Sequence, residues 1–479
     1  MKNNLVNLIG GGSRMLIFLV TIPLLIKFMG LEKYGLWILL TSIGNVAMLL
    51  DSGLTGTSMF FVSKSITSQS KELNKVITSL FLINSIIVLI IISVFASSSG
   101  YIRDLFFSEI SFNISGAIVL IGVYSSILIS HNVFIGIIQS YENFLTVNII
   151  KFSFLLLLNS GLVILVYNDF DFFKLTLWMV FCSSLALLFY IRWALYYVKF
   201  KNYRWIYSKE SFKEVTNFSL NTWLGYAGNV LFNQMDKIIL GLIGTPYILG
   251  AYAAIISITT YINSLATVGL QPLIPQVAKL YPKLEKNKVE IFKIFSFSLE
   301  FNTAFVFSLG LLMMPFLSYI LYGIMDIEKN AVDLPFYFFI AIVIYSLNSL
   351  YVPGFYSLMA IKESRTVGRI QFLSAVVALF MVYILGNKYG LLGAIIGNGG
   401  FIISYYFNFK MSHVLKSNYL KWINTIIVYI AIYIIVVFFY SLYFDNLIIK
   451  LILTFTGILT FLVLFFKRNI DTIKTKSSK

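Results

Sequence analysis

The chain alternates between long apolar runs and short polar stretches. Each apolar run extends for about 20 residues, enough for a helix to cross about 30 Å of hydrocarbon at about 1.5 Å per residue. Strands of a membrane barrel would instead alternate with period two. The pattern therefore predicts an all-α polytopic membrane protein with about fourteen transmembrane helices. They are expected at residues 5–29, 34–56, 77–97, 115–138, 145–167, 174–197, 215–238, 246–270, 293–319, 335–358, 366–386, 390–410, 421–443 and 447–466.

Four of these helices carry a polar stripe when residues are placed about 100° apart around the axis. The first span has Asn4, Asn7, Gly11, Arg14 and Thr21, and the second has Thr41, Asn45, Ser52 and Thr55. The seventh has Asn221, Thr222, Gly225, Asn229, Asn233 and Asp236, and the eighth has Thr260, Asn263, Ser264, Thr267 and Gln271. Because a lipid-facing surface is apolar, four stripes predict a central water-filled cleft that serves as a substrate cavity. The alternative is hydrogen bonding between helices of a packed bundle.

A weak internal repeat relates the two halves of the chain. The segment from Gly30 to Gly35 resembles the segment from Gly244 to Gly250, and two dipeptides also match, Gly53-Leu54 with Gly269-Leu270 and Thr146-Val147 with Thr366-Val367. The offsets are 214, 216 and 220 residues, a period that holds six spans. An even number of spans gives both halves the same orientation in the membrane. We expect a six-helix lobe at 1–198, a basic interfacial loop at 199–214, a second six-helix lobe at 215–412, and two more helices with a basic tail at 413–479.

Composition and charge agree with a membrane protein of defined orientation. Hydrophobic residues make up 59% of the chain and charged residues 12%, against about 25% charged in soluble domains. With the N-terminus in the cytoplasm, all but eight of the 36 basic residues fall at inner ends and loops. The exceptions are Lys27, Lys33, Arg103, Lys174, Lys237, Lys329, Lys388 and Lys450. The positive-inside rule then places both termini in the cytoplasm, and the net charge of +16 indicates topology rather than nucleic-acid binding.

Two short loops can be interpreted from their composition. The basic loop 199–213, with Tyr203 and Trp205, is expected at the inner membrane surface, where anionic lipid attracts it. Asp169 and Asp171 on the outer side would suit a divalent ion of a membrane glycosyltransferase or polymerase. That loop has only about eight residues and no outer domain accompanies it, so a negatively charged turn explains it better.

Charged residues within the spans are candidates for function. Arg14 lies about 13 Å along the first helix, a depth at which a charge is costly unless it faces a cavity or a partner. Asp51 and Asp236 are candidates for the cavity, and Lys27, Lys151, Lys237 and Glu300 for substrate binding or ion coupling. Each has a simpler explanation: snorkelling for Arg14 and Lys151, helix-end solvation for Asp51, a surface pair for Asp236 and Lys237, and a neutral structural side chain for Glu300.

Motifs for nucleotide or metal chemistry are missing from the sequence. The glycine run at 10–12 ends in Ser13 without the lysine of a phosphate-binding loop, which argues against ATP hydrolysis. His131 and His413 are the only histidines and lie far apart, so no metal spacing exists. We expect no cofactor and no catalytic residues.

The run from Arg14 through Thr21-Ile22-Pro23, Lys27, Gly30 and Tyr34-Gly35, followed by Asp51-Ser52-Gly53, resembles bacterial polysaccharide transporters. These form the O-antigen flippase branch of the multidrug/oligosaccharidyl-lipid/polysaccharide exporter superfamily. Further similarities are Gly136 to Gln139, Asp236 to Gly241 and Gly250-Ala251-Tyr252.

This resemblance implies two six-helix lobes around a cationic cavity and two additional C-terminal helices in the bacterial cytoplasmic membrane. It implies alternating-access transport of an undecaprenyl-diphosphate-linked oligosaccharide, driven by an H⁺ or Na⁺ gradient, with polysaccharide polymerase machinery as a partner. A drug or cation antiporter of the same superfamily, whose intramembrane carboxylates would be Asp51, Asp236 and Glu300, and a peptidoglycan-precursor flippase remain open.

Overall fold

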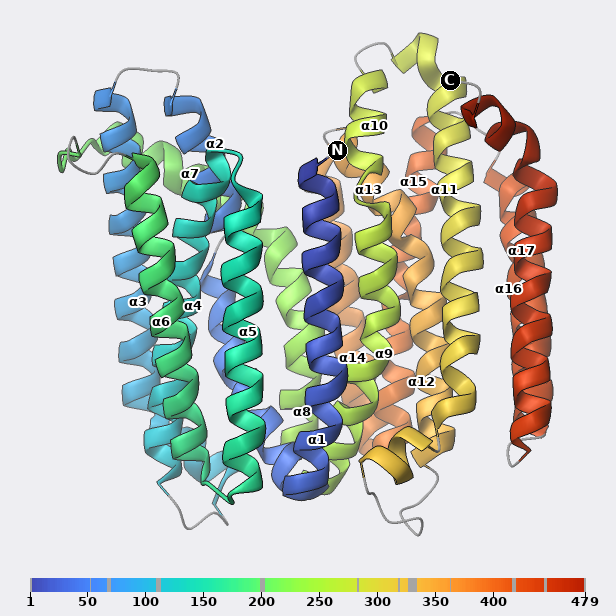
Figure 1. The fold of residues 1–479 in the computed structure, drawn as a ribbon, viewed down its shortest axis with the longest axis horizontal. Helices are drawn as coiled ribbons and strands as arrows, with labels where there is room; N and C mark the ends of the chain where they lie inside the picture. Colours follow the sequence, from blue (N-terminus) through green and yellow to red (C-terminus); the bar gives the residue numbers. More distant parts are fainter. Residues whose placement is uncertain are drawn as a thin grey trace. The chain divides into compact units, whose positions relative to one another are not determined.

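The structure is a computed structural model of residues 1–479. It describes the chain except at residues 1, 52, 67–69, 109–112, 199–202, 282–283, 318, 326–333, 362, 416–418, 443–445 and 478–479. Side chains are also outside the described part at 2–15, 70, 221–222, 224–226, 229, 275, 284–285, 324, 364, 419–425 and 470–477. Every regular element among the described residues is helical, which confirms the all-α class (Figure 1).

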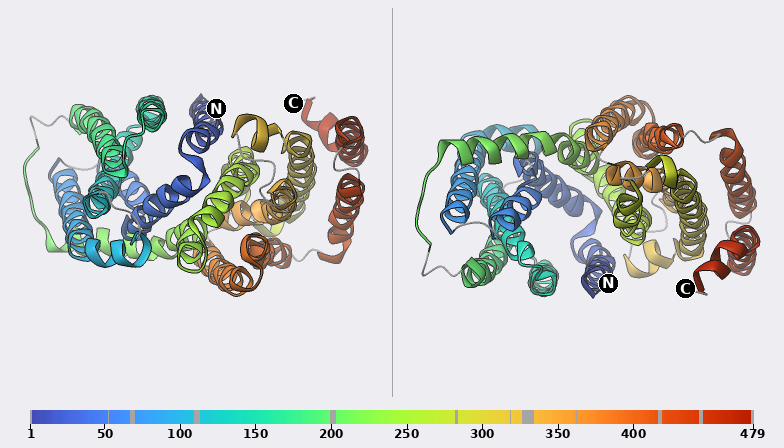
Figure 2. Two further views of the ribbon diagram at one scale, coloured as in Figure 1. Left: turned by 90° about the horizontal axis from the view of Figure 1, so that it is seen from below. Right: turned by 90° about the horizontal axis from the view of Figure 1, so that it is seen from above.

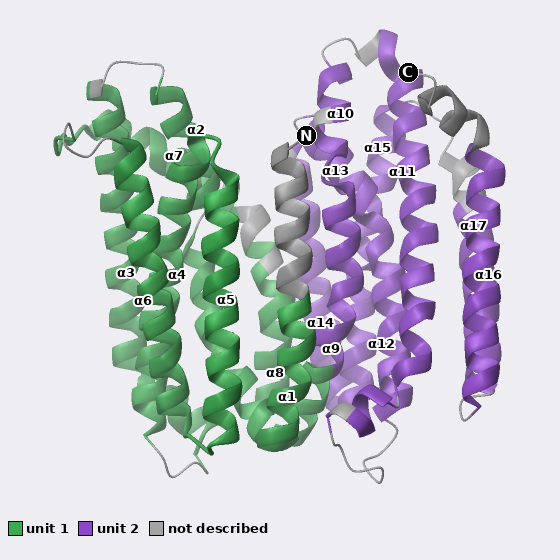
Figure 3. Cartoon of the chain, viewed as in Figure 1, with its two compact units in different colours: residues 1–254 green, residues 255–479 purple. Residues whose placement is uncertain are grey.

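The chain divides into two compact units, residues 1–254 and 255–479 (Figure 3). The first unit contains α1 (Lys2–Val46), η1 (Ala47–Asp51), α2 (Leu54–Ile66), α3 (Ser70–Phe106), α4 (Ile114–Ser140), α5 (Phe144–Tyr167), α6 (Phe172–Val198), α7 (Lys209–Val230), η3 (Leu231–Met235), α8 (Asp236–Ile243) and the start of α9 (Pro246–Leu270). The η elements are short 3₁₀ segments, except that η3 and η6 are π-helical turns.

The second unit contains the rest of α9 and the elements that follow it. These are α10 (Leu273–Leu280), α11 (Leu284–Met313), η5 (Met314–Phe316), η6 (Tyr319–Ile324), α12 (Leu334–Asn348), η7 (Ser349–Tyr351), α13 (Val352–Ala360), α14 (Ser364–Gly397), η8 (Asn398–Tyr405), α15 (Tyr406–Val414), α16 (Tyr419–Leu442) and α17 (Leu447–Ser477).

All the predicted spans fall in helical structure. By length and composition, nine helices among the described residues are long and apolar enough to cross a membrane. Two of the long helices each cover two predicted spans. Within α1 the one non-helical residue is Gly30, with φ of 76°, and within α14 it is Gly390, with φ of 59°. Gly30 lies between two predicted spans, and Gly390 is the first residue of the predicted span 390–410. Both adopt a backbone conformation that other residues rarely take. Turns at these two glycines are compatible with fourteen crossings, and that number stays a prediction.

Each unit has one helix that is packed centrally among its neighbours. Figure 2 shows the helices of both units nearly end on. In the first unit α4 contacts α2, α3 and α6 and buries Ile118, Ile129 and Val133 almost completely. In the second unit the α12–α13 segment is the most buried candidate span, and α17 is the least buried of the nine. The central helices are the fourth span of each predicted six-span half.

The contact boundary between the units differs from the predicted lobe boundary. The predicted lobes meet at the loop 199–214, whereas the contact division falls inside α9 after Ala254. The physical reason is that α7 packs against α2 and α3, while η3 and α8 pack against α1. The whole seventh predicted span is thereby grouped with the first unit. The repeat-based lobes 1–198 and 215–412 stay a prediction.

Candidate functional site

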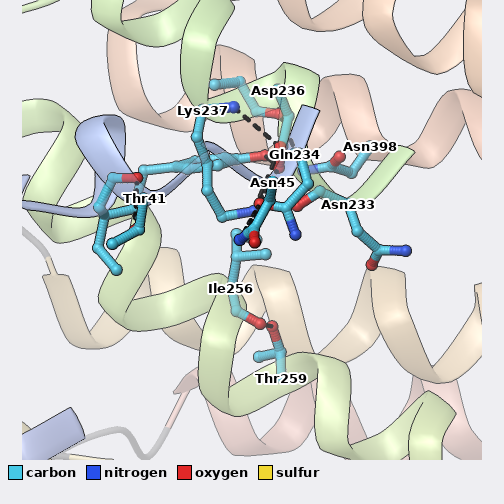
Figure 4. Close-up of polar contacts among 12 residues, drawn as sticks. Thr41, Asn45, Asn233, Gln234, Asp236, Lys237, Ile256, Thr259 and Asn398 are labelled. Atoms are coloured by element: carbon cyan, nitrogen blue, oxygen red, sulfur yellow. Dashed lines mark hydrogen bonds and ion pairs between the residues drawn. The ribbon is translucent and has the colours of Figure 1, made fainter. Parts of the chain in front are cut away.

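A buried ion pair stands at the start of α8 in the first unit (Figure 4). The side chain of Asp236 is 2% exposed and that of Lys237 is 12% exposed, and Lys237 Nζ lies 3.2 Å from Asp236 Oδ1. The same ammonium also donates a hydrogen bond to the carbonyl of Asn233. Sequence reasoning left open a solvated surface pair, but the burial shows that these charges are enclosed by protein.

The Asp236 carboxylate is satisfied by donors from two helices. The Tyr252 hydroxyl, on α9, donates to Oδ2 at 2.7 Å, and the backbone N–H of Lys237 donates to Oδ1 at 2.8 Å. Tyr252 is itself fully buried. Removing a carboxylate from water costs several kcal/mol unless charge and hydrogen bonds replace the lost hydration. The cluster supplies both, so an ion pair persists where an isolated charge would not.

The π-helical turn η3 directly precedes this pair and carries two amide side chains. Gln234 Oε1 accepts a weak hydrogen bond of 3.4 Å from Asn45 Nδ2 on α1. A π turn widens the helix locally and is frequent at functional sites. The candidate residues Asn45, Asn233, Asp236 and Lys237 thus belong to one polar cluster, to which Gln234 and Tyr252 also belong. We name these six residues the α8 cluster.

Asp51 is also buried, and it lies where the helix of the second predicted span is interrupted. It ends η1 and is 7% exposed. Its Oδ1 accepts a hydrogen bond of 3.3 Å from the backbone N–H of Leu54, the first residue of α2, and its Oδ2 accepts one of 2.6 Å from Asn132 on α4. Gly53, with φ of 73°, makes the turn between the two helical pieces. The expected alternative of helix-end solvation does not hold, because Asp51 binds protein donors.

In the second unit the candidate residues of α9 contact two tyrosines. Asn263 lies close to Tyr351, and Gln271 lies close to Tyr356. Thr267 donates to the carbonyl of Ser264 within its own helix at 2.8 Å. Gln271 remains exposed, and Asn263 and Thr267 are half-buried. The polar stripe on α9 therefore lies partly beside η7 and α13 and is partly accessible.

Glu300 bonds to the C-terminal helix. Its Oε2 accepts a hydrogen bond of 2.8 Å from Asn469, which is 7% exposed on α17. Glu300 therefore joins α11 to α17, and a structural role accounts for its position.

The remaining candidates are less informative. Lys27 on α1 is exposed and Lys151 on α5 is half-buried. The side chains of Arg14, Asn221 and Asn229 lie outside the described residues.

Metal coordination gains no support from the described residues, which contain no group of three or more histidine, cysteine or acidic side chains suited to an ion. His131 is 4% exposed, and its Nε2 lies 2.9 Å from the carbonyl of Ser183. Its ring also packs against Phe154 and Tyr190. These contacts make His131 a packed hydrogen-bonding residue.

Comparison with known families matches residues 1–281 to the family described as Polysaccharide biosynthesis protein. The chain belongs to this family. The match covers more than half of the sequence and includes the α8 cluster and α1. A search of curated proteins found no sequence match.

Solved structures show that this family member shares its fold with transporters. The lipid II flippase MurJ in an inward closed conformation superposes with a TM-score of 0.74 at 14% identity, over 97% of this chain and 99% of that chain. An inward-facing multidrug resistance MATE transporter of the MOP superfamily gives 0.65 at 12% identity, over 84% and 96%. A Vibrio cholerae MATE transporter gives 0.60 at 13% identity, over 88% and 97%. At these identities the likeness establishes the fold alone.

Sequence reasoning missed several residues that complete the polar sites of this polysaccharide biosynthesis protein. Gln234 lies in η3, which an α-helical projection of 100° per residue cannot represent. Tyr252 was noted only as part of a motif, because its bond to Asp236 depends on the turn between α8 and α9. Asn132, the partner of Asp51, belongs to none of the four polar stripes predicted from the sequence.

Proposed function

We propose that this protein is a flippase that moves an undecaprenyl-diphosphate-linked oligosaccharide across the bacterial cytoplasmic membrane by alternating access, for surface polysaccharide synthesis. The proposal rests on two findings for the same chain, the family match and the fold similarity. A member of the polysaccharide biosynthesis family has, over nearly its whole length, the fold of a lipid II flippase. Because that solved structure is a flippase for lipid II, the similarity favours a lipid-linked substrate.

The α8 cluster supports a role in handling an anionic headgroup. Lys237 is compensated by Asp236 and the carbonyl of Asn233. An entering diphosphate offers more negative charge than one carboxylate and would compete for the ammonium. Asp236 would still be held by the Tyr252 hydroxyl and a backbone N–H. In this scheme Lys237 exchanges partners as the headgroup passes, and neither charge is left without a hydrogen-bonding partner.

The energy source and the partners follow from the same proposal. An H⁺ or Na⁺ gradient would drive the cycle, because the sequence contains no phosphate-binding loop for ATP. Both termini would lie in the cytoplasm. Polysaccharide polymerase machinery on the outer side would consume the delivered repeat unit.

Drug or cation antiport is a second candidate, which the fold similarity to multidrug resistance MATE transporters favours. Such a transporter needs an intramembrane carboxylate, and the buried Asp236 supplies one. The family match to polysaccharide biosynthesis argues for the flippase.

One experiment separates these functions. The protein is expressed in a strain that lacks its own polysaccharide flippase, and both surface glycan and efflux of a cationic dye are measured. Restored glycan without dye efflux supports the flippase. Dye efflux without restored glycan, in a strain supplied with several defined lipid-linked repeat units, supports the antiporter and contradicts the proposal.

A further inference from the structure

The segment before α7 is fixed to the first unit by side-chain hydrogen bonds. The Tyr203 hydroxyl lies 3.0 Å from Thr78 Oγ1, and the backbone N–H of Ile206 donates to the same Thr78 oxygen at 3.2 Å. Thr78, on α3, is completely buried. Beyond this point, Ser79 on α3 donates to Ser211 on α7 at 3.3 Å. These hydrogen bonds therefore fix residues 203–211 against α3.

The position of Thr78 sets the depth of this segment. The apolar part of α3 is expected to begin at residue 77, whereas the helix itself begins at Ser70. The first two turns of α3 therefore extend beyond the hydrocarbon, and Thr78 marks its edge. A segment bonded to Thr78 lies at the level of the lipid headgroups, where aromatic residues with a polar edge are favoured.

The outward-facing side chains of residues 203–214 match that environment. Trp205 and Tyr207 are each 59% exposed. Arg204, Lys209 and Lys213 are exposed as well. Of the two acidic residues in this range, Glu214 faces Lys64 on α2 at 3.6 Å. The segment thus presents two aromatic rings and three basic side chains, and its remaining carboxylate, Glu210, forms no ion pair among the described residues.

We propose that residues 203–214 form a membrane-surface anchor that binds anionic phospholipid headgroups. The aromatic rings provide insertion at the interface, and the basic side chains provide selectivity for negative charge. The anchor includes the start of α7, so it ties the entry into the second half of the chain to the membrane surface. This inference does not depend on which substrate is transported.

The test measures Trp205 fluorescence in the full-length protein, reconstituted in lipid nanodiscs with brominated lipids. The contribution of Trp205 is the difference between the wild type and Trp205→Phe. We expect brominated phosphatidylglycerol to quench this contribution more than brominated phosphatidylcholine does at every equal bromine content. The difference between the lipids should fall at about 1 M salt, where the screening length is about 3 Å.

Charge variants identify the groups responsible. The triple variant Arg204→Glu, Lys209→Glu, Lys213→Glu should lose the preference for phosphatidylglycerol. The matched triple variant Lys33→Glu, Lys174→Glu, Lys388→Glu, at exposed positions near the opposite ends of the helices, should keep it. If the charge-reversed protein fails to fold, the corresponding glutamine triple replaces it. Equal quenching by both lipids would contradict the proposal and leave only an aromatic belt. No quenching by either lipid would also contradict it, because Trp205 would then face water or a protein partner.

Discussion

Gly35 and Gly250 lie backbone against backbone where α1 crosses the start of α9. A Cβ atom on Gly35 would lie 2.1 Å from the carbonyl oxygen of Pro246, and one on Gly250 would lie 1.9 Å from the carbonyl oxygen of Leu31. Both distances are far below a van der Waals contact. The internal repeat matches these same two glycines, so equivalent positions of the two predicted halves meet within the first unit.

We therefore expect Gly35→Ala and Gly250→Ala each to destabilise the protein by about 1–3 kcal/mol, because the added methyl group meets rigid backbone. Thermal unfolding of the purified protein in detergent measures the effect. Gly56→Ala is the control, since a Cβ atom there meets nothing within 4 Å. If Gly35→Ala unfolds at the same temperature as Gly56→Ala, the close crossing is wrong.

The buried ion pair predicts a pattern of non-additive stabilities. Lys237→Met should cost about 3–5 kcal/mol, because Asp236 is left as an uncompensated buried charge. The double variant Asp236→Asn, Lys237→Met removes both charges and should be markedly more stable than Lys237→Met alone. The measurement is thermal unfolding of the wild type, both single variants and the double variant. Strictly additive losses would mean that the two side chains do not act as a pair.

The positions of turns were easier to predict than the contacts between helices. Gly30 was placed between two spans by the lengths of the apolar runs, and the structure puts a non-helical residue there. The partners of Asp236 and Asp51 were not predictable in the same way. Tyr252 and Asn132 reach them across a turn or from another helix, and apolar periodicity carries no information about such pairings.

A group of buried asparagines in the second unit illustrates the same limit. The predicted span 335–358 is interrupted by the 3₁₀ segment η7, which leaves carbonyl groups without their helical partners. Asn302 donates to the carbonyl of Ser349, and Asn408 donates to that of Leu350, both at 2.9 Å. Neither asparagine belongs to a polar stripe predicted from the sequence, so its role becomes visible only when the irregular segment is known.

Asn408 is expected to be the most sensitive of these residues, because its Oδ1 also accepts the backbone N–H of Gly354 at 2.9 Å. Asn408→Ala leaves two buried backbone groups unsatisfied and should cost about 1–3 kcal/mol for each. Asn387→Ala is the control, since Asn387 is exposed and bonds only within its own helix. Equal unfolding temperatures for the two alanine variants would show that Asn408 does not support η7.

Arg14 remains the deepest basic candidate on the first predicted span. If it engages the diphosphate, Arg14→Lys should keep part of the transport activity and Arg14→Gln should lose most of it, since an ammonium cannot reproduce bidentate binding of phosphate oxygens. Glycan export at matched expression in the membrane is the measurement. Wild-type export by Arg14→Gln would mean that Arg14 only snorkels to the inner headgroups.

Transport of a purified polyprenyl-diphosphate-linked oligosaccharide by the reconstituted protein tests the central claim most directly. Proteoliposomes receive the lipid-linked sugar in one leaflet, and a membrane-impermeant glycosidase reports its arrival in the other. The account predicts transfer that requires the wild-type protein, is strongly reduced in the Asp236→Asn, Lys237→Met double variant, and is kept in Lys388→Gln, a variant at an exposed position. Transfer no faster than in protein-free liposomes, under an imposed H⁺ or Na⁺ gradient, would contradict the account.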